Sequence, residues 1–182
     1  MLWRGAFPAV LAVFRVESPG TSVALLTIAE VPTMHAHVAL FFTAALSLAP
    51  AGPKLDPALS AQVEARVSIV REWAADPILV QAVREANSSG RSMAEIQTIN
   101  GEWEDATGVT PFMRTLIDHP AARRLKELRS SHPEIQEAFL TDAAGANVAI
   151  TNKTSDFYQG DEPQYREAFK EGKGGLHIGE LS

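Results

Sequence analysis

The chain has 182 residues, of which 46% are hydrophobic, and this suits one domain with a buried core. Its formal net charge is −6 at pH 7, which argues against the clustered Lys and Arg that non-specific nucleic-acid binding requires. It has no cysteine, which excludes disulfides, thiol nucleophiles and thiolate metal sites.

The first fifty residues differ in composition from the rest of the chain. Apolar runs such as FPAVLAVF and SVALLTIAEV dominate them, and only four side chains there are charged: Arg4, Arg15, Glu17 and Glu30. No run reaches the length of about 20 residues that a membrane-spanning helix requires. The acidic excess of the chain therefore lies after residue 50.

A targeting signal is predicted from Met34 onward. Residues 38–48 are uncharged and mostly apolar, and the APA at residues 49–51 matches the small-residue pattern of a signal-peptide cleavage site. His35 and His37 stand where a signal peptide usually has Lys or Arg.

We therefore expect residues 34–51 to be a cleaved signal peptide and the mature protein to be periplasmic. Because a signal peptide belongs at the extreme N-terminus, residues 1–33 are interpreted as an upstream extension assigned in error. The alternative for the apolar stretch is a buried or fraying N-terminal helix.

Helical patterns run from residue 56 to about residue 130. Asp56-Pro57 predicts a helix start, with an Asp N-cap before a Pro at the first helical position. Apolar residues then recur at spacings of three and four, which is typical of an amphipathic helix: Leu59, Val63, Val67, Val70 and Trp73. Further helix starts are predicted at Asp76-Pro77, at the capping box Ser92–Glu95, at Thr110-Pro111 and at His119-Pro120.

Strand patterns begin near residue 134. Residues 134–142 and 147–151 predict a hairpin, with Gly145 at the turn position that favours positive φ. Asp161 predicts an N-cap for a short helix with Pro163 in its first turn, and the LHIGELS at residues 176–182 predicts the opening of another strand.

This order of elements predicts an α+β fold, with long N-terminal helices packed on an antiparallel sheet. Two or three strands leave an exposed, partly apolar sheet edge, which is a liability for a soluble domain. We therefore expect the sheet to be incomplete at the C-terminus.

The segment TSDFYQGDE at residues 154–162 concentrates hydroxyl, acidic, amide and aromatic side chains between the hairpin and the short helix. Together with the strands around it, from residue 139 to residue 180, it resembles the core of the PAS-like periplasmic sensor domains called Cache or PDC domains. The helical part upstream is also similar, so the resemblance covers residues 55–182. Members of that family usually continue past the HIGE strand with several more strands.

The resemblance implies an extracytoplasmic domain that senses or binds a small molecule such as an amino acid, an amine or a carboxylate. Because the chain shows no kinase or cyclase module, a membrane-bound partner would have to read the signal. Two alternatives stay open: an interaction module whose sheet a partner completes, and a fragment with no function of its own.

The resemblance also implies which residues contact the ligand. In PAS-like sensors the ligand lies between the sheet and the segments over it, and on this basis the candidates are Ser155, Asp156, Tyr158, Gln159 and Asp161. An Asp suits a ligand ammonium group, Ser and Gln suit hydrogen bonds, and Tyr suits stacking. The structural alternative is that the hydroxyl and acidic residues form turns and the helix cap, and that the aromatic residues belong to the core.

An enzyme is not expected. Asp161 and Glu162 are neighbours at a helix start and point in different directions, unlike the facing carboxylates of glycosidases. The five His residues are scattered without metal-ligand spacing, and no nucleophile elbow or phosphate-binding loop occurs. We therefore expect no catalytic residue, no metal and no cofactor.

Overall fold

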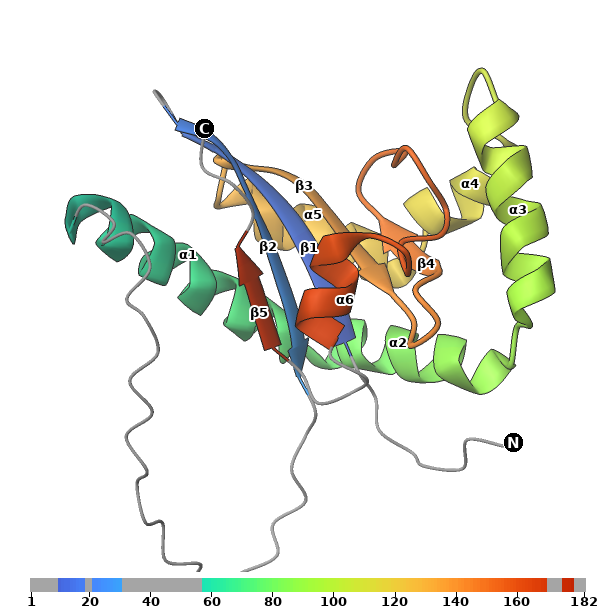
Figure 1. The fold of residues 1–182 in the computed structure, drawn as a ribbon, viewed down its shortest axis with the longest axis horizontal. Coiled ribbons are helices and arrows are strands. Elements are labelled where there is room, and N and C mark those ends of the chain that lie inside the picture. The colour runs from blue at the N-terminus through green and yellow to red at the C-terminus, as the bar shows by residue number, and fades with distance from the viewer. Residues whose placement is uncertain (1–9, 19–20, 31–56, 170–174, 179–182) are drawn as a thin grey trace, which may run out of the picture.

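The structure is a computed structural model that describes residues 10–18, 21–30, 57–169 and 175–178. Helices and strands form a mixed α+β arrangement, which confirms the predicted fold class (Figure 1). The segment interpreted as a signal peptide, residues 34–51, lies outside the described residues.

In the described ranges, five antiparallel strands make up the sheet, in the order β4-β3-β1-β2-β5. Their bounds are β1 Val10–Ser18, β2 Thr21–Glu30, β3 Ile135–Thr141, β4 Asn147–Ile150 and β5 Gly175–Ile178. Strand β1 lies in the middle, where Val13 pairs with Thr27 of β2 on one side and with Phe139 of β3 on the other. Strand β5 pairs with β2 through residues such as Ile178, which lies opposite Leu26.

The sheet corrects the expectation that too few strands are present. The hairpin at β3 and β4 and the strand at β5 lie where the sequence predicted them, but β1 and β2 were missed. These two strands come from residues 10–30, which the sequence analysis placed outside the domain. Their apolar, β-branched runs flank Pro19-Gly20, a dipeptide typical of turns, and this is a hairpin pattern that the interpretation as an upstream extension overlooked.

Helices α1 to α5 begin where the sequence predicted. Asp76, Ser92, Thr110 and His119 each accept a backbone N–H as N-caps, and α2 ends at Gly90, which has the left-handed φ of 69°. The bounds are α1 Pro57–Ala74, α2 Pro77–Ser89, α3 Met93–Asp105, α4 Pro111–Ile117, α5 Pro120–Ser130 and α6 Pro163–Phe169.

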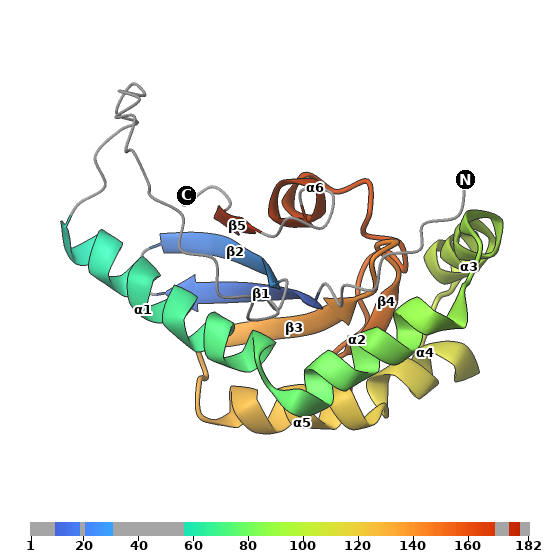
Figure 2. The ribbon, with the colours of Figure 1, turned by 90° about the horizontal axis from the view of Figure 1, so that it is seen from below.

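The helices cover the sheet unevenly. Helices α1, α2 and α5 lie on one face, whereas α6 lies on the other face, against β2 and β5 (Figure 2). Helices α3 and α4 lie beyond β4, at the end of the sheet that is farthest from β5 (Figures 1 and 2). The chain between β4 and α6 therefore runs close to α3.

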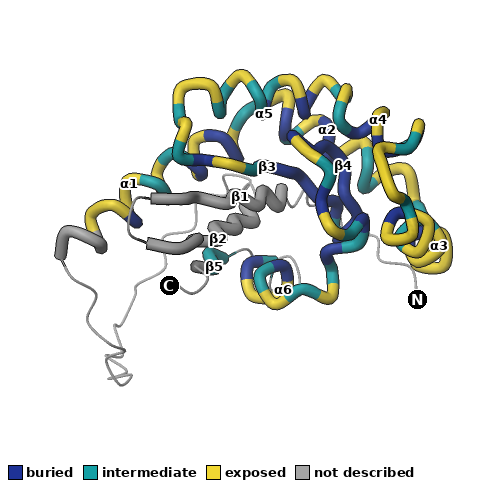
Figure 3. The backbone as a smooth tube through the Cα atoms, turned by 90° about the horizontal axis from the view of Figure 1, so that it is seen from above, coloured by how far each residue is buried: buried dark blue, intermediate teal, exposed yellow. Residues whose placement is uncertain are grey.

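One apolar core fills the space between the sheet and the helices α1, α2 and α5. The predicted face of α1 is buried there at Val63, Val67, Val70 and Trp73, and Leu140 of β3 contributes from the sheet. Figure 3 shows β3 and β4 buried along most of their length while the outer faces of these helices are exposed. This core therefore binds the helical layer to the sheet.

A second apolar core joins the other side of β3 and β4 to α3, α4 and α6. Trp103 and Phe157 are its largest fully buried side chains, and Phe139 and Ile150 contribute from the two strands. Because Phe157 belongs to the TSDFYQGDE segment, this core holds the candidate loop in place.

Removing the N-terminal hairpin is expected to abolish cooperative folding. Strand β3 would lose β1, and β5 would lose β2, which is its one neighbour among the described strands. We predict a single cooperative thermal transition by circular dichroism for the full chain and none for a variant consisting of residues 34–182.

A variant that lacks only residues 1–9 keeps both strands and serves as the control, so its melting curve should match that of the full chain. If residues 34–182 melted at the same temperature as the full chain, β1 and β2 would have no part in the fold.

Candidate functional site

The TSDFYQGDE loop is fastened to the end of α3. The indole Nε1 of Trp103 donates a 2.9 Å hydrogen bond to the carbonyl of Thr154. The side-chain oxygen of Asn100 accepts the backbone N–H groups of Phe157 and Tyr158, at 2.9 and 2.8 Å. Two side chains of one helix thus fix the path of the loop at three points.

The loop is also tied to the β3–β4 hairpin. The backbone N–H of Asn147 donates to the carbonyl of Phe157, and that of Gln159 donates to the carbonyl of Gly145 at 2.7 Å. Gly145 has a φ of 87°, and a Cβ there would lie 2.5 Å from the Cα of Gly160. A side chain at position 145 would therefore collide with the loop, so the predicted turn glycine also allows the close approach.

Three of the predicted site residues hydrogen-bond within the loop. The Ser155 hydroxyl donates to the Asp156 carboxylate, and the buried Gln159 donates its side-chain amide to the Asp156 carbonyl at 2.9 Å. That carbonyl also accepts from the hydroxyl of Thr154 and the side-chain amide of Asn147. Asp156 thus organises the loop through its backbone carbonyl, as the structural alternative expected of turn residues.

The other two predicted residues lie at the loop surface. Tyr158 is half-buried and forms a single bridge with Ala146, whereas Asp161 is exposed. Helix α6 begins at Pro163, and the carbonyl of Glu162 accepts the backbone N–H of Arg166. The cap position is therefore at Glu162, one residue after the predicted Asp161.

Beneath the loop lies a pair of buried polar atoms that sequence reasoning missed. The Thr141 hydroxyl and the Asn147 side-chain oxygen have no hydrogen-bond partner in the described part of the chain, although both residues are almost fully buried. Thr141 and Asn147 are also paired across β3 and β4. A polar Asn at the start of an otherwise apolar strand was the available signal.

A register shift brings this pair to the loop side of the sheet. Between Leu140 and Thr141 the pairing skips one residue of β4, as in a β-bulge, so that Val148 and Ala149 both join the core under α1, α2 and α5. Thr141 is therefore on the same side of the sheet as Phe139, and Asn147 is on the same side as Ile150. Phe139 and Ile150 belong to the core on the loop side.

A buried carboxyl group closes the turn of the hairpin. Asp142 accepts the backbone N–H groups of Ala144 and Ala146, both at 2.9 Å, and burial raises the pKa of its carboxyl group. The Tyr165 hydroxyl of α6 donates to the carbonyl of Ala143, and burial, together with the charge of Asp142, raises the pKa of that phenol. The hairpin turn is thereby held to α6.

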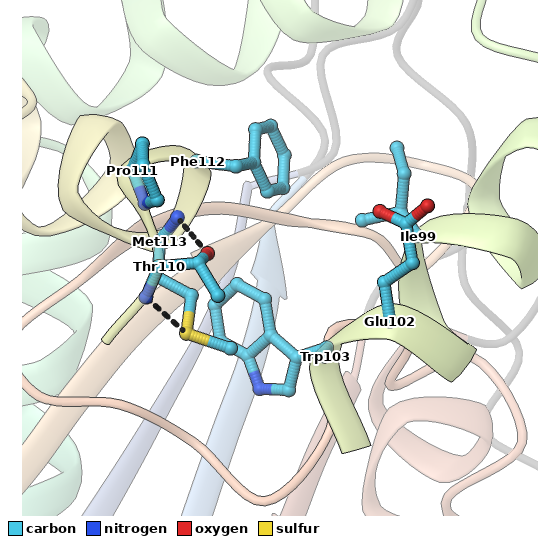
Figure 4. A pocket seen from close by; sticks show the side chains of 7 residues that line it. All are labelled: Ile99, Glu102, Trp103, Thr110, Pro111, Phe112 and Met113. Carbon is cyan, nitrogen blue, oxygen red and sulfur yellow. Dashed lines mark hydrogen bonds between the residues drawn. The ribbon is translucent and has the colours of Figure 1, made fainter. Parts of the chain in front are cut away.

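A hollow of about 320 Å³ lies on the far side of Phe157, between α3 and the start of α4. Ile99, Glu102 and Trp103 line it from α3, and residues 110–113 line it from α4 (Figure 4). A second hollow of about 430 Å³ lies between the first turns of α2 and α5. The five predicted residues line neither of these two hollows.

A cluster of metal ligands and a membrane-spanning helix are both absent from the described residues. There, no three His, Cys, Asp or Glu side chains are grouped as metal ligands. No helix within the described ranges combines the length and the apolar composition needed to cross a membrane.

Replacing Asn100 with Ala is expected to loosen the loop. Two half-buried backbone N–H groups would lose their acceptor, which costs about 1–3 kcal/mol of unfolding free energy. Urea denaturation of the full chain measures this. The control is Gln97→Ala on the exposed side of the same helix, where we expect a change within about 0.5 kcal/mol. Equal effects of the two substitutions would contradict the role given to Asn100.

Replacing Asp142 with Asn is expected to change how stability depends on pH. Because its folded-state pKa is raised, ionised Asp142 disfavours folding; this penalty is absent below the ordinary value of 3.8, grows as the pH rises to the folded-state value, and then stays constant. Asn keeps the acceptor oxygen without the charge. The stability of D142N relative to the unmodified protein should therefore rise with pH across this interval in denaturation measurements.

The variant D142A separates the two roles of this side chain, since it lacks the acceptor as well as the charge. It should be less stable than D142N at every pH. A relative stability of D142N that falls as the pH rises would show that the buried site favours the charged carboxylate.

Comparison with known proteins does not assign the chain to a family. No family model, curated protein or solved structure matches it.

Proposed function

We propose that the chain is a small-molecule-binding module of the Cache type, working outside the cytoplasm without an output domain of its own. The ligand would bind at the end of β3 and β4, beneath the loop of residues 154–162. The observation that carries this proposal is the pair of buried, unpartnered polar atoms of Thr141 and Asn147 at that place.

These two atoms have no hydrogen-bond partner among the described residues, and this has an energetic cost. A buried polar group without a hydrogen bond costs about 1–3 kcal/mol of stability. Buried polar groups in folded proteins are generally paired, so each exception calls for an explanation. A ligand that offers one hydrogen-bond donor to the Asn147 oxygen and one partner to the Thr141 hydroxyl would recover both costs on binding.

The surroundings support a ligand of small size. The loop over the pair is fixed by Trp103, Asn100 and Gly145, so that its shape is set before any ligand arrives. An antiparallel sheet with a polar loop and a short helix over one face is also the arrangement that the resemblance to PAS-like sensors implies. In this proposal Gln159 and the Asp156 carbonyl form the loop side of the site, with Ser155 and Tyr158 at its rim; the exposed Asp161 has no assigned contact.

A panel of amino acids, carboxylates and amines, added to the full chain, tests the proposal by thermal shift. A ligand at a hundred times its dissociation constant should add about 2.7 kcal/mol of stability. The diagnostic variant is Thr141→Val, which removes the unpartnered hydroxyl while keeping the shape of the side chain. It should stabilise the free protein, because a buried hydroxyl without a hydrogen bond is removed. It should also lower the affinity of any stabilising ligand about tenfold.

Thr151→Val is the matched control. The Thr151 hydroxyl accepts the backbone N–H of Ala138, so this substitution should destabilise the free protein instead. A ligand whose affinity is the same in T141V and in the unmodified chain would contradict the proposed site, and a panel without any stabilising compound would contradict the proposed function.

A further inference from the structure

The hollow between α3 and α4 has the lining of a site for an organic cation. Its lining includes no residue of the loop and neither Thr141 nor Asn147, so it is separate from the site beneath that loop. Its volume of about 320 Å³ is in the range of small-ligand pockets. Apart from Thr110 and Glu102, the residues that line it are apolar.

Aromatic rings form one side of this hollow. The rings of Trp103 and Phe112 meet edge to face, with centroids 6.5 Å apart and planes at 79°. Phe157 packs behind both, with centroids 5.7 Å from Trp103 and 5.5 Å from Phe112. Figure 4 shows the Phe112 ring across the hollow from Ile99 and Glu102. The π face of an aromatic ring attracts a positive charge.

The same aromatic cluster already contacts a cation elsewhere. The guanidinium carbon of Arg91 lies 5.7 Å from the centroid of the Phe157 ring. This distance is within the range of a cation–π interaction. Arg91 thus shows that one ring of the cluster takes part in a cation–π contact.

The charges around the hollow also favour a cation. Among the described residues, Glu102 is the one charged residue that lines it, and it is exposed. Glu104 and Asp105 follow in the last turn of α3, at the end where the helix dipole is negative, and α3 contains no Lys or Arg. Among the described residues none of these three carboxylates has an ion-pair partner within 4 Å; Glu104 accepts only a neutral amide, from Asn100.

We propose that this hollow binds a small organic ammonium ion with apolar substituents, of the trimethylammonium kind. The methyl groups would contact the half-buried Phe112 ring, which Trp103 supports from behind, and the positive charge would be balanced by Glu102 at the mouth. An aromatic wall with a single carboxylate at the rim is the chemistry by which proteins recognise quaternary ammonium groups.

The test uses choline and 3,3-dimethylbutan-1-ol, which share a shape and differ in charge. Titration of the full chain by calorimetry should show saturable binding of choline, and the neutral alcohol should bind roughly tenfold more weakly. Equal affinity for the two compounds, or no saturable binding of choline, would overturn the proposal.

Variants locate the binding. Glu102→Gln should weaken choline roughly threefold, whereas Glu104→Gln, a substitution on the same helix outside the lining, should change it little. Phe112→Leu should lower the affinity for choline further, because it removes the π face. A cooperative thermal transition checks that this variant folds. If E102Q and E104Q have the same effect, or if T141V weakens choline as strongly as F112L does, choline binds elsewhere and the assignment is wrong.

Discussion

The pairing of β1 with β3 and with β2 is the constraint on which the rest of the fold depends. The β1–β2 hairpin lies between β3 and β5, two strands that come more than one hundred positions later in the chain. Through β2 it also gives β5 a neighbour, so the described strands form one sheet and need no outside strand to connect them. The interaction module stays an alternative, since β4 and β5 are the outer strands of the described sheet and could each pair with a partner.

This arrangement and a cleaved signal peptide exclude each other in one mature chain. Cleavage after Ala51 would remove β1 and β2, and Val63, Val67 and Val70 of α1 would lose the strands that their helix contacts. The exported form that the resemblance implies must therefore either retain residues 10–30 or fold without the two middle strands. The direct contacts of the loop come from β3, β4, α3 and α6, but β3 pairs with β1, so loss of the N-terminal hairpin would also affect this site.

Local sequence signals predicted the local structure well. Asp76-Pro77, the Ser92–Glu95 capping box and Gly145 each have one dominant backbone solution, and the helices and the turn follow them. The position of β1 beside β3 could not be predicted in this way, because this pairing joins residues that are far apart in the chain. The site residues could not be predicted fully for a similar reason. The sequence shows that Asp156 is polar, but only the fold reveals that its carbonyl organises the loop. Only the fold, too, shows that the Thr141 hydroxyl and the Asn147 side-chain oxygen have no hydrogen-bond partner among the described residues.

Hydrogen exchange of the full chain, resolved by peptide mass spectrometry, tests the central claim most directly. If β1 is the middle strand, its amides open only when the whole sheet opens, because both of its edges are hydrogen-bonded. Peptides from residues 10–18 should then exchange as slowly as peptides from residues 135–141. Rapid exchange of residues 10–18 beside a protected β3 would contradict the account and would remove the N-terminal hairpin from the folded domain.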